Sequence, residues 1–590
     1  MMGQIEQRVK TRIMQQLITS MIYEDIVKYQ MSNKDSNIQH VEIQGDRATY
    51  RFDVNVTRSF DRLLLVSPVM KVHHNGDEGA TTDYAGLLRD VHYTFDKDPK
   101  KVEAFICELI QTELKDRQAL THKYEAKAAV PSDFNALESY AMEGHTYHPS
   151  YKSRLGFTLA DNLKYGPDFK PSIHLKWVAV PKDKVQQTIS KTVDPTTLLH
   201  QQLGASTIEK FEKTLRRHVD DISAYAWLPV HPWQFDHVIA NDLAEEWLNG
   251  ELILLGESQE AYVPQQSIRT LSPVEKDKYY IKVPLSITNT STKRVLAPHT
   301  IENAAQITDW LKRIQADDRY LRDDLRTVFL GEVLGMSYIN HHLSSDKRTA
   351  TYGALGAIWR ENLYHYLEAN EEAIPFNALY SKDINDMPII NQWIEQYGLE
   401  TWMAQFIKVA VRPLIHMLYY HGIALESHAQ NMMLIHENGW PTRVAIKDFH
   451  DGVRFKRDLL SDIAKDPKLQ DTPIEHQRIN RNSFIETDDV ALVRDFVLDA
   501  FFFINIAQMI LFMKESYHLS ETEQWQYVYD CIQDYLETFS DLPLKTTFDL
   551  FERTIQVEKL TTRRLQEDTE LRIHHVSNPL GVIHHDSVIS

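Results

Sequence analysis

The sequence predicts an α+β protein, on three observations from different parts of the chain. Near the N-terminus, apolar residues recur at every fourth position from Ile5 to Met21, which is the spacing of an amphipathic helix. In residues 50–56 apolar and polar residues alternate instead, which predicts a β-strand. From about residue 300 onward helical patterns dominate, interrupted by one short strand pair at 431–448.

Three regions are expected along the chain, because 590 residues exceed the roughly 100–200 that one domain usually holds. They are a mixed N-terminal region at 1–135, a β-rich region at 136–320 and a mainly helical region at 321–590. A polar stretch at 121–135 marks the first boundary. Residues 280–288 alternate between polar and apolar side chains, which predicts a strand with one polar face that carries Lys282.

The composition favours a soluble protein of the cytoplasm. The most apolar run, at 500–513, is too short to span a bilayer and contains Asn505 and Gln508, so we expect a buried helix. Cys107 and Cys531 match no metal or disulfide spacing and are expected as buried thiols in a reducing compartment. The 64 Lys and Arg against 83 Asp and Glu give a net charge of −19, which disfavours nucleic acid and anionic membranes as partners.

Residues 426–452 are the first candidate for chemistry. An Asn-Gly pair predicts a hairpin turn whose two strands bring Asn431 and Asp448 together at their outer ends. An amide carbonyl and a carboxylate suit a Mg²⁺ ion that carries phosphates, and protein kinases hold their metals with a comparable Asn and Asp. Glu426 and His428 lie just upstream and offer a further oxygen ligand and a phosphate contact. The alternative is a polar hairpin with a structural Asp.

Two further segments carry groups that suit an anion. The first set consists of Ser267, Arg269, Thr270, Lys282 and Arg294, which provide hydroxyl and cationic donors for phosphate or carboxylate oxygens. The second set consists of His145, His148, Lys152 and Arg154. Two histidines without a third ligand are weak evidence for zinc, so anion binding is preferred for this segment. A solvated strand face and a polar loop are the alternatives, and Lys559 taken alone belongs to a solvated helix face.

Several familiar nucleotide and hydrolase motifs are absent from the sequence. It contains no P-loop pattern, no dinucleotide-binding glycine motif after a strand and no nucleophile elbow. Only 20 of the 590 residues are glycine. Side chains, and not a glycine-rich loop, would therefore have to hold any nucleotide.

Taken together, these motifs resemble the siderophore synthetases that work without nonribosomal peptide synthetases, the IucA/IucC family. The matching segments are EGHTYHPSYKSRLGF from residue 143, VHPWQ from 230, SIRT from 267, KVPLSITNTSTKR from 282, ESHAQN from 426, KDFHDG from 447 and NPL from 578. They extend over most of the chain. The resemblance implies a cupped-hand fold of thumb, fingers and palm around one ATP site, in a homodimer.

The resemblance also implies the reaction. A carboxylate of a citrate-derived intermediate would attack the α-phosphate of Mg-ATP to give an acyl-adenylate and pyrophosphate. An amine would then form an amide and release AMP; members that assemble staphyloferrin B imply L-2,3-diaminopropionate as this amine. The small-molecule carboxylate and amine would be the only partners besides the second subunit.

Site residues carry over from the family by motif matching. ATP and the reacting carboxylate would contact Ser267, Arg269, Thr270, Lys282, Arg294, His428, Gln430, Asn431 and Asp448. Mg²⁺ would be held by Glu426, Asn431 and Asp448, and the catalytic residues would be His428, Arg294 and Lys282. The substrate side would be lined by His145, His148, Lys152, Arg154 and Lys559.

Two other classes of function stay open at the level of the sequence. A small-molecule phosphotransferase would use the same Asn431 and Asp448 but would release ADP and a phosphorylated product. A non-catalytic protein that binds citrate or an iron chelate would need the cationic groups but no metal ligands. An Asp448→Ala variant separates these classes: an enzyme should lose turnover, whereas a binding protein should keep its affinity for the ligand.

Overall fold

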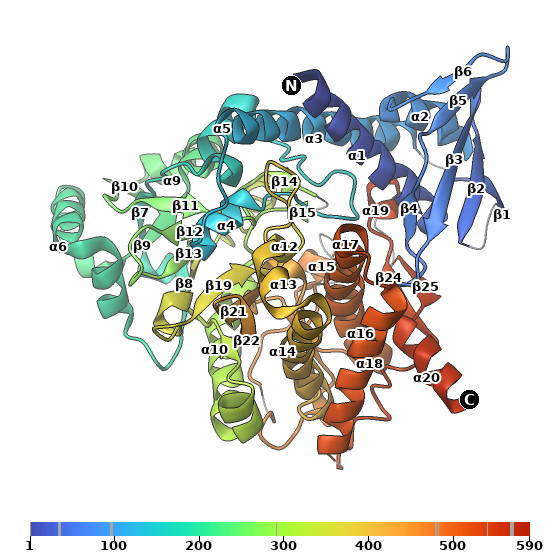
Figure 1. Ribbon diagram of the computed structural model, residues 1–590. Helices are drawn as coiled ribbons and strands as arrows, with labels where there is room; N and C mark the ends of the chain where they lie inside the picture. Colours follow the sequence, from blue (N-terminus) through green and yellow to red (C-terminus); the bar gives the residue numbers. More distant parts are fainter. Residues whose placement is uncertain are drawn as a thin grey trace.

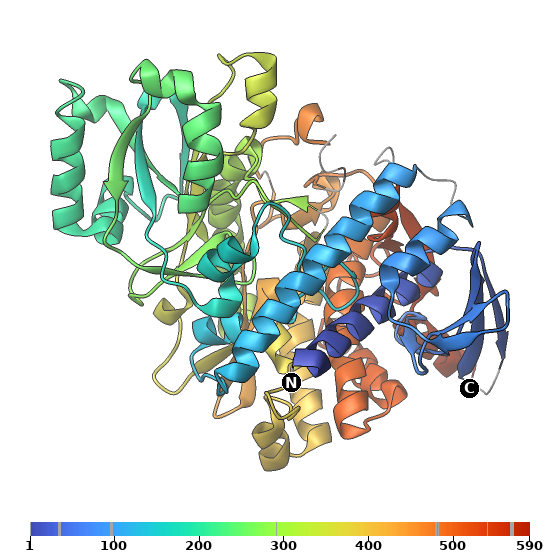
Figure 2. The same ribbon diagram turned by 90° about the horizontal axis from the view of Figure 1, so that it is seen from above.

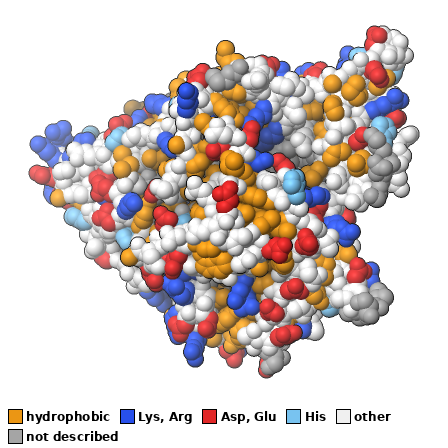
Figure 3. Space-filling view, viewed as in Figure 1, with side chains coloured by type: hydrophobic (Ala, Val, Ile, Leu, Met, Phe, Trp, Pro, Cys, Tyr) orange, Lys and Arg blue, Asp and Glu red, His pale blue; other side chains and the backbone are white. Residues whose placement is uncertain are grey.

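The computed structural model describes residues 2–33, 37–94, 98–290, 292–465, 467–477, 481, 483–539, 541–566 and 572–589. Helices and sheets are both present in all three thirds of the chain, so the α+β prediction is confirmed (Figure 1). Figure 3 shows acidic and basic side chains interspersed over one face of the molecule, with apolar side chains gathered near its middle.

The N-terminal part packs two long helices beside a twisted antiparallel sheet. Its elements are α1 Met2–Tyr23, β1 Tyr29–Asn33, β2 Ile38–Gln44, β3 Ala48–Val56, β4 Leu63–Leu65, β5 Met70–His73, β6 Glu78–Ala80, α2 Tyr84–Val91, α3 Pro99–Glu125 and α4 Phe134–Tyr140. The sheet order is β1-β2-β3-β5-β6, with β4 paired to β3. The predicted four-residue repeat of α1 is buried, and α1 lies along α3 in both views (Figures 1 and 2).

The middle of the chain is built on two antiparallel sheets, β10-β7-β9 and β11-β12-β13-β18-β17-β8. Its elements are α5 Leu159–Tyr165, β7 Lys176–Pro181, β8 Val185–Ile189, α6 Pro195–Leu215, β9 Tyr225–Val230, α7 Pro232–Gln234, α8 Ala240–Asp242, α9 Ala244–Leu248, β10 Ile253–Glu257, β11 Tyr262–Pro264, β12 Thr270–Pro273, β13 Tyr280–Lys282, β14 Thr288–Asn289, β15 Thr292–Lys293, α10 Pro298–Asp317, β16 Val328–Phe329, β17 Glu332–Tyr338, α11 Ser345–Ala350 and β18 Gly356–Arg360. Helix α10 covers β8 and β17.

The prediction of one continuous strand with a polar face at 280–288 is wrong. Strand β13 ends at Lys282, two residues before Pro284, which has no N–H to donate. All three residues of β13 are buried, because β12 and β18 pair with it on its two sides. Lys282 therefore belongs to the interior of the protein and not to a solvated strand face.

The C-terminal part surrounds the buried helix α14 with a four-stranded sheet, β16-β22-β21-β19, and further helices. Its elements are β19 Glu372–Pro375, α12 Phe376–Leu379, α13 Asn391–Tyr397, α14 Leu399–Tyr419, β20 Ile423–Leu425, β21 Met432–Glu437, β22 Trp440–Ile446, β23 Val453–Phe455, α15 Ile474–Gln477, α16 Val490–Val497, α17 Ala507–Tyr517, α18 Glu521–Thr538, β24 Thr554–Glu558, α19 Thr562–Leu565, β25 Ile573–Ser577 and α20 Pro579–Ile589. Helix α14 contacts both α18 and β22, which fixes the sheet against the helices.

Helices α16 and α17 form one long apolar helix through the π-helical segment Leu498–Ile506. This helix is long and apolar enough to cross a membrane, yet 72% of its most apolar window is buried inside the protein. The prediction of a buried core helix is therefore confirmed. Of the two thiols, Cys531 is buried as predicted, whereas Cys107 is exposed, because it falls outside the face of α3 that packs against α1.

Candidate active site

A β-hairpin in the C-terminal part sets the centre of the site. Strands β21 and β22 pair from Glu437–Trp440 at the turn to Met432–Ile446 at the outer end. Asn438 and Gly439 both have positive φ, at 50° and 87°, as a tight two-residue turn requires. At the outer end Lys447 donates its N–H to the Asn431 carbonyl at 3.0 Å. The predicted hairpin is confirmed, and Asn431 and Asp448 emerge from its two strands.

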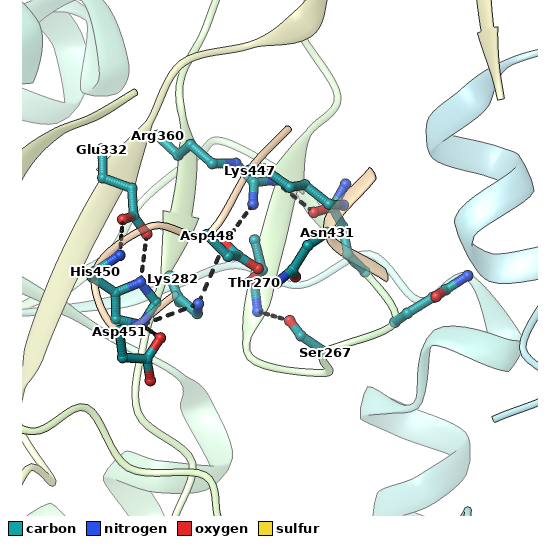
Figure 4. Close-up of polar contacts among 12 residues, drawn as sticks. Ser267, Thr270, Lys282, Glu332, Arg360, Asn431, Lys447, Asp448, His450 and Asp451 are labelled. Atoms are coloured by element: carbon teal, nitrogen blue, oxygen red, sulfur yellow. Dashed lines mark hydrogen bonds and ion pairs between the residues drawn. The ribbon is translucent and has the colours of Figure 1, made fainter. Parts of the chain in front are cut away.

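Asp448 lies between two cations (Figure 4). Its Oδ1 accepts a hydrogen bond from Arg360 Nη1 at 2.8 Å and lies 3.4 Å from Lys282 Nζ. Burial alone would raise the pKa of Asp448, but Lys282 and Arg360 outweigh it and hold the pKa well below its usual range. Asp448 is therefore an ionised carboxylate at neutral pH.

Glu426 and Asn431 supply two more oxygen groups beside Asp448. The Asn431 Nδ2 donates to the Glu426 backbone carbonyl at 2.9 Å, which orients the amide and leaves its Oδ1 as an acceptor. Burial, and the nearby charge of Asp451, raise the pKa of Glu426 to about 7. Arg454 offsets this effect only in part, and a divalent cation would restore the ionised form. Glu426, Asn431 and Asp448 together fit the hard oxygen ligands that Mg²⁺ prefers.

A cationic wall lies beside these oxygen groups in one cavity of about 440 Å³. Arg269, Lys282 and Arg294 all line it, together with Ser267. Burial lowers the pKa of all three cations, and the positive charge of Arg269 helps lower that of Arg294 to about 10. Three cations are held close together here, which is unfavourable unless an anion such as a phosphate or carboxylate lies between them.

Two side chains, those of Arg294 and Thr270, have unused hydrogen-bonding capacity. Arg294 uses Nη2 for the Asn289 carbonyl at 3.1 Å and the Thr290 hydroxyl at 2.9 Å, while its buried Nε has no partner in the described part of the protein. The buried Thr270 hydroxyl likewise has no partner among the described residues. Thr270 donates its backbone N–H to Ser267 Oγ at 3.1 Å, which fixes the turn before β12. Buried donors without partners indicate that a ligand completes the site.

Histidines complete the cavity wall. His428 and Gln430 precede Asn431 and line the cavity with it. Burial, reinforced by Arg294, lowers the pKa of His428 to about 4, so its imidazole is neutral at pH 7 and can accept a proton. His145 also lines the cavity, and its Nδ1 accepts the N–H of Tyr147 at 3.1 Å.

The four residues predicted at 145–154 do not act as one group. His145 and Arg154 line the cavity, whereas His148 and Lys152 are not among its described lining residues. Lys152 is buried in an ion pair with Asp116 at 2.7 Å and Asp168 at 3.0 Å. Its charge is thus already matched within the protein, and this placement favours a structural role over substrate binding.

Lys559 has a similar placement outside the described cavity wall. Its Nζ donates to the Glu24 carbonyl at 3.0 Å. The Glu24 carboxylate in turn accepts the backbone N–H groups of Thr561 and Thr562 at 3.0 and 2.7 Å. These contacts tie the end of α1 to the start of α19, which favours a structural role for Lys559 as well.

Sequence reasoning missed a second layer of the site, shown in Figure 4. Its members are Glu332 on β17, Arg360 on β18, His450 and Asp451. His450 and Asp451 lie inside the KDFHDG segment, so the motif itself contained a signal for them. Glu332 and Arg360 carry no local signal, because sheet pairing alone places β18 next to β13 and β17 next to β18.

Comparisons with known proteins agree with this geometry. The model of the IucA / IucC family matches residues 133–381, and a model described as a ferric iron reductase FhuF-like transporter matches residues 400–573. A citryl-spermidine/3,4-dihydroxybenzoyl-citryl-spermidine:spermidine ligase from Bacillus anthracis is 35% identical over 97% of this chain and 93% of its own length. The chain belongs to the IucA/IucC family.

Within the family, one relative is considerably more similar. A protein from Staphylococcus aureus, named 2-[(L-alanin-3-ylcarbamoyl)methyl]-3-(2-aminoethylcarbamoyl)-2-hydroxypropanoate synthase, is 61% identical over 98% of this chain and 93% of its own length. Among solved structures, the petrobactin biosynthesis protein AsbB from Bacillus anthracis has a TM-score of 0.91 at 34% identity and covers 99% of this chain and 97% of its own. The ATP-bound aerobactin synthetase IucA from Klebsiella pneumoniae, at 17% identity and a TM-score of 0.74, shares the fold.

Proposed function

We propose that this protein is an ATP-dependent, AMP-forming acid–amine ligase of siderophore biosynthesis. It adenylates a carboxylate of a citrate-derived intermediate and condenses it with an amine, L-2,3-diaminopropionate. The observation that carries this proposal is the single cavity in which the oxygen groups of Glu426, Asn431 and Asp448 face the cations Arg269, Lys282 and Arg294. Such a cavity suits Mg-ATP together with a second anion.

The substrate pair is supported by the 61% identical relative. The name of that relative describes a 2-hydroxypropanoate core with two amide arms, one ending in a 2-aminoethyl group and one in an L-alanin-3-yl group. The second arm is the amide that the side-chain amine of L-2,3-diaminopropionate would form. The first arm corresponds to a citrate already joined to 1,2-diaminoethane.

In the first step a carboxylate oxygen attacks the α-phosphorus of ATP and pyrophosphate leaves. Negative charge builds up on the phosphate oxygens, and Arg269, Lys282 and Arg294 are placed to stabilise it. Mg²⁺, held by Glu426, Asn431 and Asp448, would supply further charge neutralisation. Binding of ATP and the carboxylate substrate in one cavity would lower the entropic cost of bringing the two anions together.

In the second step the amine nitrogen attacks the acyl carbon, the bond to AMP breaks and the nitrogen loses a proton. The neutral imidazole of His428, which lines the cavity, is the group we assign to accept that proton. Enclosure of the intermediate also limits its hydrolysis by water.

The experiment is a matrix of carboxylates and amines with purified protein and ATP. We expect carboxylate-dependent release of pyrophosphate, amine-dependent release of AMP, and a product mass equal to the amide. Release of ADP and phosphate would contradict adenylation and revive the phosphotransferase alternative, while binding without turnover would revive the citrate-binding alternative. The similarity to synthases and ligases favours neither alternative. A homodimer in the cytoplasm, without nucleic-acid or membrane partners, stays a prediction.

A further inference from the structure

The charge of the cavity is divided between two walls. Arg269, Lys282 and Arg294 come from the middle of the chain, around β12 to β15. Asp499 and Glu558 come from the C-terminal part and line the same cavity, together with Arg454 and Arg563. Asp499 lies in the π-helical segment between α16 and α17, and Glu558 is the last residue of β24, which packs against that segment. In the proposed mechanism the residues of the cationic wall bind phosphates and a carboxylate. The acidic wall, formed by Asp499 and Glu558, has no role in that mechanism.

Asp499 differs in its ion pairing from the acidic residues near it, Asp495 and Glu558. Asp495, one turn earlier, forms an ion pair with Arg494 at 2.7 Å. Glu558 lies 3.3 Å from Arg563. Asp499 accepts only the Glu558 backbone N–H, at 3.4 Å, and has no ion-pair partner among the residues that the structure describes. Burial, with the negative charge of Glu558, raises the pKa of Asp499 to about 7.

The positive charge of Arg454, which lines the same cavity, offsets the charge of Asp499 only in part. An enclosed carboxylate in this state is destabilised, and a bound cation removes that cost. The surroundings indicate what kind of cation fits. Phe496, Ala500 and Ile504 lie on the same helix and line the cavity with Asp499. An apolar wall next to a carboxylate suits an ammonium group at the end of a short aliphatic chain.

We infer that Asp499 is a specificity-determining subsite that binds the primary ammonium group of a substrate. This inference rests on the proposed function and adds to it. The same chemistry occurs in both substrates, because the citrate intermediate ends in an aminoethyl group and L-2,3-diaminopropionate carries an ammonium group on its α-carbon. The cationic wall then holds the anionic end of the reactants, and Asp499 holds the cationic end.

The test variant is Asp499→Asn. Asparagine keeps a side-chain oxygen for the Glu558 N–H, so a purely structural role is preserved while the charge is removed. Asp499→Glu restores the charge. The matched control is Asp530→Asn on α18, an exposed carboxylate that accepts a hydrogen bond from Gln526 at 2.8 Å.

The measurements compare charged with uncharged substrates in each half-reaction. ATP–pyrophosphate exchange is driven either by citrate or by its mono-amide with 1,2-diaminoethane. Condensation is run either with L-2,3-diaminopropionate or with hydroxylamine, a nucleophile that is uncharged at neutral pH. For the substrate that Asp499 binds, we expect kcat/KM of Asp499→Asn to fall by about 10- to 100-fold, the range for a charge-assisted hydrogen bond. Its uncharged counterpart should change by less than about twofold.

The arm in which the loss appears identifies the source of the ammonium group. A loss in exchange with the aminoethyl amide assigns it to the carboxylate substrate, and a loss in condensation with L-2,3-diaminopropionate alone assigns it to the incoming amine. Equal effects on charged and uncharged substrates, or no effect, would overturn the inference, as would a failure of Asp499→Glu to recover activity. If the unmodified protein shows no carboxylate-dependent exchange, the proposed function fails first, and the inference falls with it.

Discussion

Glu332 holds His450 by two hydrogen bonds of 2.8 Å each, one from the backbone N–H to Oε2 and one from Nδ1 to Oε1. Because a carboxylate only accepts hydrogen bonds, Nδ1 carries a proton. Nε2 lies 3.4 Å from Lys282 Nζ and 3.3 Å from Asp451 Oδ1. Both side chains are buried. Glu332 is therefore a positioning residue that acts on Lys282 through His450.

The variant Glu332→Gln tests this arrangement. Glutamine keeps the size of the side chain but replaces one accepting oxygen with a donor, so the imidazole loses its fixed tautomer. We expect kcat to fall by about 10- to 100-fold with little change in the KM for ATP, as for the loss of groups that orient ligands in other sites. Glu361→Gln is the control, because Glu361 also accepts a backbone N–H but contacts Lys312 and Tyr366. Equal effects of both variants would refute the positioning role.

Removal of the Asp448 charge should abolish adenylation. Asp448→Asn takes away one predicted metal ligand and leaves Lys282 and Arg360 without their shared counter-ion. We expect carboxylate-dependent pyrophosphate release to fall by at least about 100-fold, in the range for loss of a group that stabilises transition-state charge. The protein should still bind a fluorescent ATP analogue and unfold cooperatively. Undiminished turnover would show that Asp448 has no role in the reaction.

Asn431 is a second predicted metal ligand, and its replacement should change the Mg²⁺ concentration that the protein requires for activity. Asn431→Ala removes the amide whose Nδ2 donates to the Glu426 carbonyl at 2.9 Å. We expect the Mg²⁺ concentration for half-maximal activity to rise by about tenfold or more, since one oxygen ligand of the ion is lost. Gln430→Ala, one residue earlier in the same cavity wall, should leave the Mg²⁺ requirement unchanged. Activity that is unaffected by a chelator would contradict both expectations.

The raised pKa of Asp499 predicts a pH-dependent difference in stability. Its pKa is about 7 in the folded protein against 3.8 ordinarily, so the folded state favours the protonated form. The stability that Asp499 contributes is present below pH 4 and is lost as the pH rises through 7. Asp499→Asn has no proton to lose, so its Tm minus that of the unmodified protein should increase from pH 5 to pH 8, without ligands. A constant difference, as expected for Asp530→Asn, would show that Asp499 is not perturbed.

Lys152 offers a test of structural against substrate-binding roles. Lys152→Met leaves the buried carboxylates Asp116 and Asp168 without their shared lysine, and breaking a buried pair costs about 3–5 kcal/mol. We expect this loss in the free energy of unfolding by urea, with KM for the carboxylate substrate changed by less than about twofold. Lys164→Met, at an exposed position of α5, should affect neither quantity. A large rise in KM without destabilisation would restore the substrate-binding prediction for Lys152.

Local sequence patterns predicted much of the secondary structure correctly. The predictions that were wrong have physical causes. The repeat of α1 and the Asn-Gly turn were predictable because they depend on neighbouring residues alone. The strand at 280–288 was mispredicted because burial by β12 and β18, and the missing N–H of Pro284, decide where β13 ends. Alternation along a sequence cannot show whether a polar residue such as Lys282 faces water or an internal cavity.

The residues of the candidate site also fall into those that local sequence patterns predict and those that only tertiary packing reveals. Residues in compact motifs, such as His428, Asn431 and Asp448, were found because several polar groups occur close together in the sequence. Glu332 and Asp499 were missed because each stands alone between apolar neighbours, and only tertiary packing brings it to the site. Lys152 was assigned to the substrate because its partners Asp116 and Asp168 are not visible from its own segment.

The described walls of the cavity run from Met142 to Ile573, and helix α1 is fastened to the start of α19 through Glu24. A chain emerging from the ribosome therefore cannot complete the cavity until nearly all of it has been translated, even though its N-terminal sheet can already have formed. A partly synthesised or C-terminally clipped chain would hold Arg269, Lys282 and Arg294 without the cavity residues Asp499 and Glu558.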